Sequence, residues 1–203
     1  MRIIKVSVAI VVLWLVLVGC VRLLPLDHWG LAIGVNFLFM AFFSFLSDVA
    51  LYPLYSSRYF AARPFEKGGS IYRWCGVGFF LRVLRWVGWE RALRKDQPIS
   101  KDLTRLSNYE SGTRGSEAVH LCSAIAVAVF TLWVGWTTSI NDLKWLVLFN
   151  ILVNVYPVML QRYNRPRVAR AIEVMQRREG VSPDHGVPRV TGNRCDGQEV
   201  GQA

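Results

Sequence analysis

Four long apolar segments alternate with charged segments along the chain. They cover residues 6–24, 29–47, 118–136 and 143–160. Each is close to the roughly 20 residues that an α-helix needs to cross the hydrocarbon core of a bilayer. The pattern predicts an all-α integral membrane protein with about four transmembrane helices, built as a single membrane domain over residues 1–179.

Residues 56–117 separate the second and third apolar segments and contain no comparable run. Within them, residues 71–93 mix tryptophan and phenylalanine with arginine, which is typical of an amphipathic helix lying in the membrane interface. A helix packed against the spans fits the same periodicity equally well. Val49–Tyr55, just before this segment, could re-enter the membrane or leave it.

The two ends of the chain have their own patterns. Arg2 and Lys5 precede the first apolar segment, and Cys20 ends a sequence that resembles a lipoprotein cleavage box. That segment is therefore either a retained span, which we favour, or a cleaved signal. Residues 180–203 are rich in Gly, Pro and Arg and poor in apolar residues, which predicts a disordered tail.

Composition strengthens the membrane interpretation. The 203 residues are 53% hydrophobic and 19% charged, with a formal net charge of +10. Soluble domains carry about 25% charged residues, which are spread more evenly. No nucleic-acid-binding module accompanies the basic residues, so we expect no nucleic-acid partner. The cysteines form no C-x-x-C pair, which argues against a zinc or redox site.

Lysine and arginine residues are distributed asymmetrically around the spans. They gather in residues 56–117 and after residue 160, whereas the opposite loops hold little beyond Arg22 and Lys144. Cytoplasmic loops carry such an excess of positive charge. We therefore expect a multi-pass protein of the cell (inner) membrane whose termini and large middle segment are cytoplasmic.

Glu117 and His120 form an E-x-x-H pattern where the third apolar segment begins. Residues three apart share one face of a helix, so the carboxylate could orient the imidazole as a general base. A polar start of a helix is the simpler alternative. Metal sites use the same spacing, but no further ligands are evident, so we predict no metal.

The segment Gln161–Arg167 follows the last span and contains three arginines. Arg162, Arg165 and Arg167 could bind phosphate groups through paired hydrogen bonds, or they could simply anchor the protein to anionic lipid headgroups. Pro166 disfavours helix at the preceding residue, so we expect the chain to turn there, with Asn164 supporting the turn.

Polar residues also interrupt the fourth span. Asn150 and Asn154 lie four residues apart and share a helix face. An unpaired amide is costly in lipid, so we expect both to bond a neighbouring span. Pro157 is expected to bend the end of this helix.

The Q-R-Y-N-R-P-R sequence of Gln161–Arg167 resembles glycosyl-4,4'-diaponeurosporenoate acyltransferases. Two shorter segments are similar to the same family: Thr113-Arg114 with Glu117 and His120, and Phe65-Glu66-Lys67 with Gly69 and Tyr72. The resemblance runs from about the second span to Arg178. It implies a membrane enzyme that esterifies a sugar hydroxyl of a glycosylated carotenoid with a fatty acyl chain.

The resemblance and the residue chemistry together give one leading hypothesis. It is acyl transfer to a glycosylated carotenoid or other membrane glycolipid, with acyl-CoA or an acyl carrier as donor and no bound cofactor. His120 and Glu117 are the candidate catalytic residues. The candidate substrate-binding residues are Glu66, Lys67, Arg114, Arg162, Tyr163, Asn164, Arg165 and Arg167. The alternative is a non-catalytic scaffold whose basic face binds anionic lipid or a partner enzyme. The sequence leaves the oligomeric state open.

Overall fold

The computed structural model describes residues 2–47, 58–60, 64–88, 103–136 and 139–178, and all regular structure within them is helical. Four of these helices are long and apolar enough to cross a membrane. This confirms the predicted fold class. Val49–Tyr55 and the tail after residue 179 lie outside the described residues.

The first two spans form an antiparallel pair. Helix α1 covers Arg2–Leu23 and α2 covers Trp29–Leu46, with the His28 imidazole accepting a hydrogen bond from the first turn of α2. Most large apolar side chains of α1 are exposed, whereas Leu31 and Val35 of α2 are buried. In a bilayer the exposed side chains of α1 would contact lipid. The helix can lie there because its backbone hydrogen bonds are all internal.

The other two spans are longer than a bilayer requires. Helix α7 covers Leu103–Gly135. Helices α8 (Ile140–Asn150), η5 (Ile151–Val155) and α9 (Tyr156–Arg178) follow one another, with 37 helical residues from Asp142 to Arg178. At 1.5 Å per residue, α7 alone is about 50 Å long, against roughly 30 Å for the hydrocarbon core.

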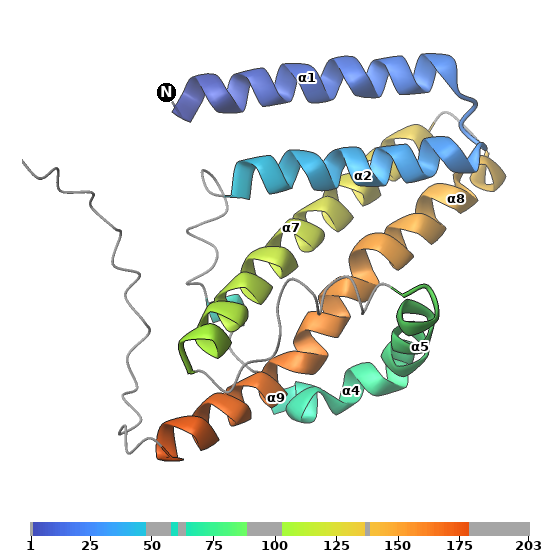
Figure 1. The fold of residues 1–203 in the computed structure, drawn as a ribbon. Coiled ribbons are helices and arrows are strands. Elements are labelled where there is room, and N and C mark those ends of the chain that lie inside the picture. The colour runs from blue at the N-terminus through green and yellow to red at the C-terminus, as the bar shows by residue number, and fades with distance from the viewer. Residues whose placement is uncertain (1, 48–57, 61–63, 89–102, 137–138, 179–203) are drawn as a thin grey trace, which may run out of the picture.

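The arrangement places four chain segments at one end of the molecule. The start of α1, the end of α2, the start of α7 and the end of α9 all lie on the left in Figure 1, and α7 and α9 extend beyond the α1–α2 pair. The main apolar core lies nearer the other end, where Val35 of α2 meets Val127 of α7 and Leu146 of α8. The candidate site lies near the projecting ends.

A chain of short helices packs against the outside of α9. It consists of η3 (Pro64–Gly69), α4 (Ser70–Tyr72), η4 (Arg73–Val77) and α5 (Gly78–Trp86), and η2 (Arg58–Phe60) lies before it in the chain. Val77 is fully buried and Phe80 stacks on Tyr156 at 4.9 Å between ring centroids. Both contacts hold this segment against the last span.

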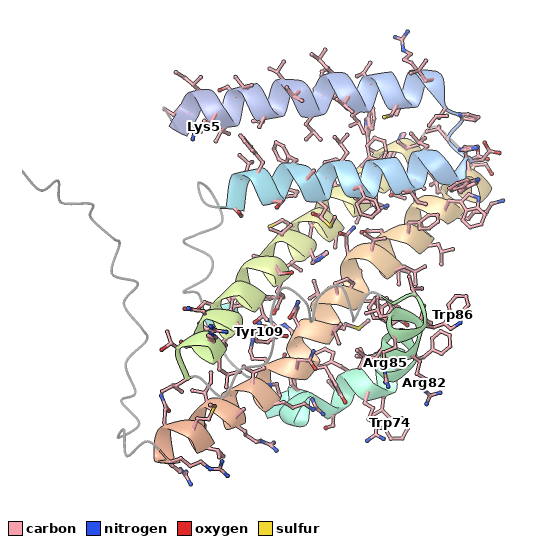
Figure 2. All side chains as sticks on the ribbon, in the orientation of Figure 1. Lys5, Trp74, Arg82, Arg85, Trp86 and Tyr109 are labelled. Atoms are coloured by element: carbon pink, nitrogen blue, oxygen red, sulfur yellow. The ribbon has the colours of Figure 1, made fainter. Side chains whose placement is uncertain are left out.

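The opposite face of the same segment is exposed. Trp74 and Trp86 are 91% and 88% exposed, and Figure 2 shows them with Arg82 and Arg85 on the outward side of η4 and α5. One face is therefore packed on the protein while the other carries aromatic and basic groups suited to a membrane interface. The packed face of residues 71–88 fits a helix packed against the spans, and the exposed face fits a helix lying in the membrane interface. Residues 89–93 lie outside the described part of the chain.

Helix α9 contradicts the turn expected at Arg165–Pro166. The helix continues through Pro166 to Arg178, with Asn164 inside it. A proline in a helix removes one backbone hydrogen bond but does not forbid the helix. Tertiary contacts on both sides of Pro166 compensate here, because its ring packs beside Gly69 and the Arg165 side chain is tied to α7.

Candidate active site

Arg162 lies at the centre of a buried cluster of charged side chains. Its Nε donates a hydrogen bond of 2.9 Å to Glu117 Oε1 on α7, and its Nη1 donates to Glu66 Oε1 on η3. Its Nη2 donates to the Tyr59 carbonyl at 2.9 Å. One guanidinium therefore joins η2, η3 and α7 to α9, which a lysine with a single nitrogen could not do.

Arg165 lies one turn further along α9 and completes the cluster. Its Nη2 donates to Glu117 Oε2 and its Nη1 donates to the Phe60 carbonyl at 3.2 Å. The side chains of Glu117, Arg162 and Arg165 are at most 8% exposed. Two carboxylates thus face two guanidiniums in a dry site, where removal of any one leaves an uncompensated charge.

Aromatic rings cover the two arginines. The Arg162 guanidinium lies 4.2 Å from the centre of the Tyr59 ring, and that of Arg165 lies 5.2 Å from the Phe60 ring. Cations over ring faces gain electrostatic attraction that grows as water is removed. Burial, more than the nearby charges, raises the pKa of Tyr59 above its usual value.

Tyr72 extends the cluster on the η3 side. Its hydroxyl donates a hydrogen bond of 2.7 Å to Glu66 Oε1. Burial, together with this bond to a carboxylate, raises the pKa of Tyr72 to about 12. The phenol therefore stays protonated at physiological pH and keeps donating to Glu66.

Gly69 explains how Glu66 reaches Arg162. Its φ of 87° is in the left-handed region, and a Cβ built there would lie 2.9 Å from the Tyr163 carbonyl oxygen. Only glycine combines this backbone conformation with so close an approach to α9. The Glu66–Gly69 segment singled out in the sequence thus brings the Glu66 carboxylate against α9.

His120 has a different environment from the one expected. Both oxygens of Glu117 accept hydrogen bonds from arginines, and the described structure has no Glu117–His120 hydrogen bond. A shared helix face brings two residues to the same side, but it does not decide which partner a carboxylate takes. The proposed Glu117–His120 pair is therefore replaced by a Glu117–arginine cluster.

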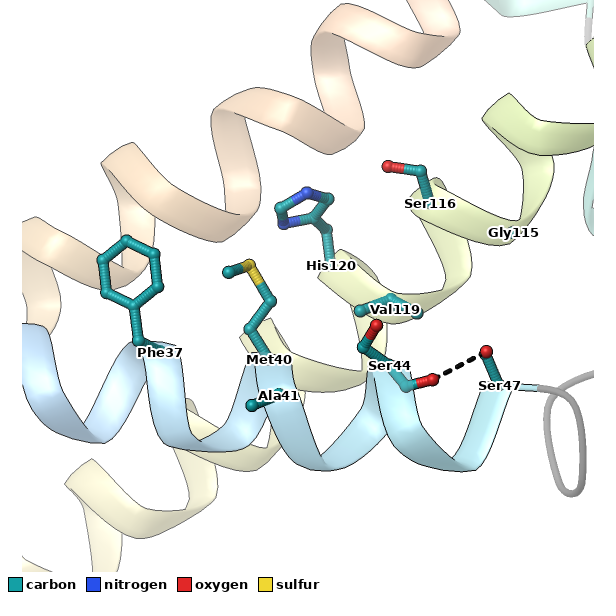
Figure 3. A pocket seen from close by; sticks show the side chains of 9 residues that line it. All are labelled: Phe37, Met40, Ala41, Ser44, Ser47, Gly115, Ser116, Val119 and His120. Carbon is teal, nitrogen blue, oxygen red and sulfur yellow. Dashed lines mark hydrogen bonds between the residues drawn. The ribbon is translucent and has the colours of Figure 1, made fainter. Parts of the chain in front are cut away.

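The His120 side chain lines a pocket of about 520 Å³ between α2 and α7. Figure 3 shows the imidazole above α2, with Met40 and Ser44 on the α2 side and Ser116 one turn earlier on α7. The remaining lining residues are Phe37, Ala41, Ser47, Gly115 and Val119. The pocket is largely apolar with a few polar groups, as lipid-binding sites are.

Three asparagines form a second buried polar group beside His120. Asn154 donates to Asn36 Oδ1 of α2 at 2.7 Å and to Asn150 Oδ1 at 3.0 Å, and Asn150 donates to the Ala124 carbonyl of α7 at 3.0 Å. This confirms that both amides of the fourth span bond neighbouring spans. His120 of α7 lies one turn before Ala124 and Asn154 lies one turn after Asn150, so the Asn150–Ala124 bond between these antiparallel helices brings His120 and Asn154 to the same level.

The other candidate residues lie at the edge of this region. Arg167 is exposed, its guanidinium 3.7 Å from the centre of the Tyr163 ring. Arg114 forms an ion pair of 2.7 Å with Glu110. The Lys67 side chain lies outside what the structure describes. No group of three or more His, Cys, Asp or Glu side chains is placed to hold a metal ion within the described residues.

Three residues of this region were missed from the sequence. Tyr59 and Phe60 supply carbonyls and rings to the arginines, and the sequence carries no signal for that role. Asn36 did leave a signal, because it is an amide inside an apolar span. Polar residues at such positions face the bundle interior.

Comparison with known proteins points to one family. A family model described as glycosyl-4,4'-diaponeurosporenoate acyltransferase matches residues 56–174. No curated protein and no solved structure matches the chain. The matched segment is more than half of the chain and contains the whole charged cluster together with His120. The chain therefore belongs to the glycosyl-4,4'-diaponeurosporenoate acyltransferase family.

Proposed function

We propose that this protein transfers a fatty acyl chain to a sugar hydroxyl of a glycosylated carotenoid or a related membrane glycolipid. The observation that carries the proposal is His120, which lies inside the family segment and lines a largely apolar pocket between two spans. A glycolipid in the bilayer could place its sugar in this pocket while its hydrocarbon part stays in lipid.

His120 acts as the general base in this mechanism. Its imidazole takes the proton from the sugar hydroxyl as the hydroxyl oxygen attacks the carbonyl carbon of the acyl thioester. A C–O bond forms and the C–S bond breaks. The imidazolium then returns its proton to the departing thiolate, so the histidine is unchanged after each turnover.

The charged cluster has a supporting role. Arg162 and Arg165 are engaged by protein carboxylates, so they hold α7 and α9 together instead of binding donor phosphates. Because Glu117 lies one turn before His120 on α7, this attachment fixes the position of the imidazole relative to α9. Of the three arginines in Gln161–Arg167, Arg167 is the exposed one, and in this proposal it attracts a polyphosphorylated donor such as acyl-CoA.

The projecting ends of α7 and α9 face the cytoplasm in this proposal. The start of α7 carries Arg105 and Arg114, and α9 carries six further arginines, in agreement with the rule for cytoplasmic loops. Acyl-CoA and acyl carriers are cytoplasmic, so the donor would reach the pocket from that side. The acceptor would enter from the membrane between α2 and α7.

Lipid analysis of a deletion strain tests the proposal. Cells lacking the protein would be complemented with wild type, His120→Ala or His28→Asn. His28 is the matched control, because asparagine keeps a cap acceptor at the start of α2 while the imidazole is lost. We expect an acylated glycolipid with wild type and His28→Asn, and its unacylated form with His120→Ala.

Two results would contradict the proposal. Identical lipids in deletion and wild-type cells would show that the protein is not this acyltransferase. They would favour a scaffold that binds anionic lipid or a partner enzyme. Full activity of His120→Ala would leave acyl transfer in place but remove the general base. Immunoblots of membrane fractions would show that each variant is present at the wild-type level.

A further inference from the structure

The asparagines beside His120 form a hydrogen-bond network that can run in only one direction. Asn36 Nδ2 donates to the Ala32 carbonyl at 2.8 Å, and Asn150 Nδ2 donates to the Ala124 carbonyl at 3.0 Å. A backbone carbonyl can only accept. Neither amide can therefore be flipped, and each must present its Oδ1 oxygen to the interior of the cluster.

Asn154 is fixed by these two oxygens. It is fully buried, and its Nδ2 donates to both Asn36 Oδ1 and Asn150 Oδ1. An amide nitrogen has two hydrogens, so both are used. The Oδ1 oxygen of Asn154 is left as an acceptor whose direction is set by three helices.

Two buried atoms in this region lack hydrogen-bond partners among the described residues. They are Asn154 Oδ1 and His120 Nδ1, and the Asn150–Ala124 hydrogen bond one turn away brings their side chains to the same level of two packed helices. One is an obligatory acceptor and the other can be a donor. Leaving both unpaired in a low-dielectric interior is costly, so a small rotation of the imidazole that joins them is favoured.

The backbone around Asn154 is adapted to this position. Asn154 lies in η5, a π-helical turn over Ile151–Val155, and such turns are frequent at functional sites. Pro157 follows it and has no amide hydrogen, so a carbonyl of the preceding turn loses its helical donor.

We propose that Asn154 is the positioning residue for His120. Its Oδ1 accepts the hydrogen of Nδ1, which selects the neutral imidazole protonated at Nδ1 and leaves the lone pair of Nε2 to act in the pocket. The tautomer assignment rests on the two buried atoms without partners and is independent of the proposed function. Its catalytic consequence rests on the proposed function, in which Nε2 is the base.

The assignment differs from the one suggested by the E-x-x-H spacing. Glu117 would have held His120 as an ionised carboxylate, but its oxygens are occupied by Arg162 and Arg165. A neutral amide oxygen instead orients the ring without adding charge to the apolar interior. That is the less costly choice at membrane depth, where each unpaired charge is expensive.

Nitrogen-15 NMR of the histidine rings tests the tautomer directly. The full-length protein would be labelled at its histidine ring nitrogens, placed in lipid nanodiscs, and measured above the pH range in which histidine titrates. The His120→Ala variant identifies the His120 signals among the three histidines of the chain. We expect the hydrogen on Nδ1. A wild-type spectrum with the hydrogen on Nε2 would overturn the proposal.

Two matched variants separate positioning from packing. Asn154→Leu removes the acceptor, whereas Thr131→Val removes a buried hydroxyl of α7 that lies outside the network. We expect Asn154→Leu to lose the Nδ1–H tautomer and to lower kcat by roughly tenfold or more with little change in KM. Thr131→Val should keep the tautomer. Loss of the tautomer in both variants, or in neither, would contradict the assignment.

The two proposals can fail separately. If His120 carries its hydrogen on Nδ1 but His120→Ala is fully active, Asn154 still positions the ring and His120 is not the general base. If His120 is needed for activity but carries its hydrogen on Nε2, His120 remains the candidate base and Asn154 is not its positioning residue.

Discussion

Arg162 of α9 and Glu117 of α7 are 45 residues apart in sequence, yet Nε and Oε1 lie 2.9 Å apart in a buried ion pair. This pair joins the last two spans at the end of the molecule where α7 and α9 project. It also stands one turn from His120. The same contact therefore links the stability of the helix pair to the position of the candidate base.

The first prediction concerns this pair. Glu117→Gln should destabilise the protein by about 3–5 kcal/mol, because it leaves two buried guanidiniums short of a carboxylate. Arg162→Lys should also destabilise it, because lysine keeps the charge but lacks the fork that holds both carboxylates and the Tyr59 carbonyl. Melting temperature in detergent would report the loss. Arg177→Lys, at an exposed position on the same helix, should change it little. Equal melting temperatures for all three variants would show that the cluster does not hold the spans together.

A second prediction concerns the close approach of η3 to α9. Gly69→Ala should lower the melting temperature and weaken the Glu66–Arg162 pair, because its Cβ would lie 2.9 Å from the Tyr163 carbonyl at a positive φ. Gly112→Ala is the control, since Gly112 is helical with nothing within 4 Å of an added Cβ. There alanine should stabilise the helix by about 0.5–1 kcal/mol. Tolerance of Gly69→Ala would contradict the packing.

Filling the His120 pocket is a third test. Ala41→Trp places a large ring among the lining residues, and it should reduce kcat/KM for the glycolipid acceptor by about tenfold or more, equal to about 1.4 kcal/mol. Phe45→Trp, at an exposed position of the same helix, should retain activity. Purified protein in nanodiscs with acceptor and acyl donor would give the comparison. Unchanged kinetics in Ala41→Trp would place acceptor binding elsewhere.

The fourth prediction fixes the orientation. Cys75 is exposed on η4, and in a variant with Cys20, Cys122 and Cys195 replaced by serine it is the one thiol. A membrane-impermeant maleimide should label it in inverted vesicles and not in intact spheroplasts. Asp27→Cys in a cysteine-free background, in the loop between α1 and α2, should show the opposite pattern. Labelling of Cys75 from outside would reverse the topology.

The spans and the cluster residues differ in how far the sequence predicts them. The apolar segments near 29–47 and 143–160 coincide with α2 and with the α8–α9 helix, because span length follows from bilayer thickness. The extension of α7 back to Leu103 was not predicted, since residues 103–117 have no apolar run. The helix there is held by contacts with α9 that a single segment does not reveal.

Pro166 is a single residue at which local sequence chemistry predicts the wrong structure. Its local chemistry argues for a turn, and on that basis the sequence predicts the end of a helix. In the structure α9 continues through Pro166. The Arg165 side chain bonds Glu117 of α7, and Gly69 packs beside the Pro166 ring. A proline inside a helix costs about 3 kcal/mol or more, and the tertiary contacts of α9 outweigh that local cost.

Hydropathy and residue type are local properties, so they were enough to predict the membrane class and the approximate spans. Only the tertiary structure decided how the candidate site residues pair. Glu117 could have joined His120 or the arginines of α9, and the packing of α7 against α9 selected the arginines. Side-chain partners depend on which helices meet and at what depth, and a single segment of sequence does not contain that information.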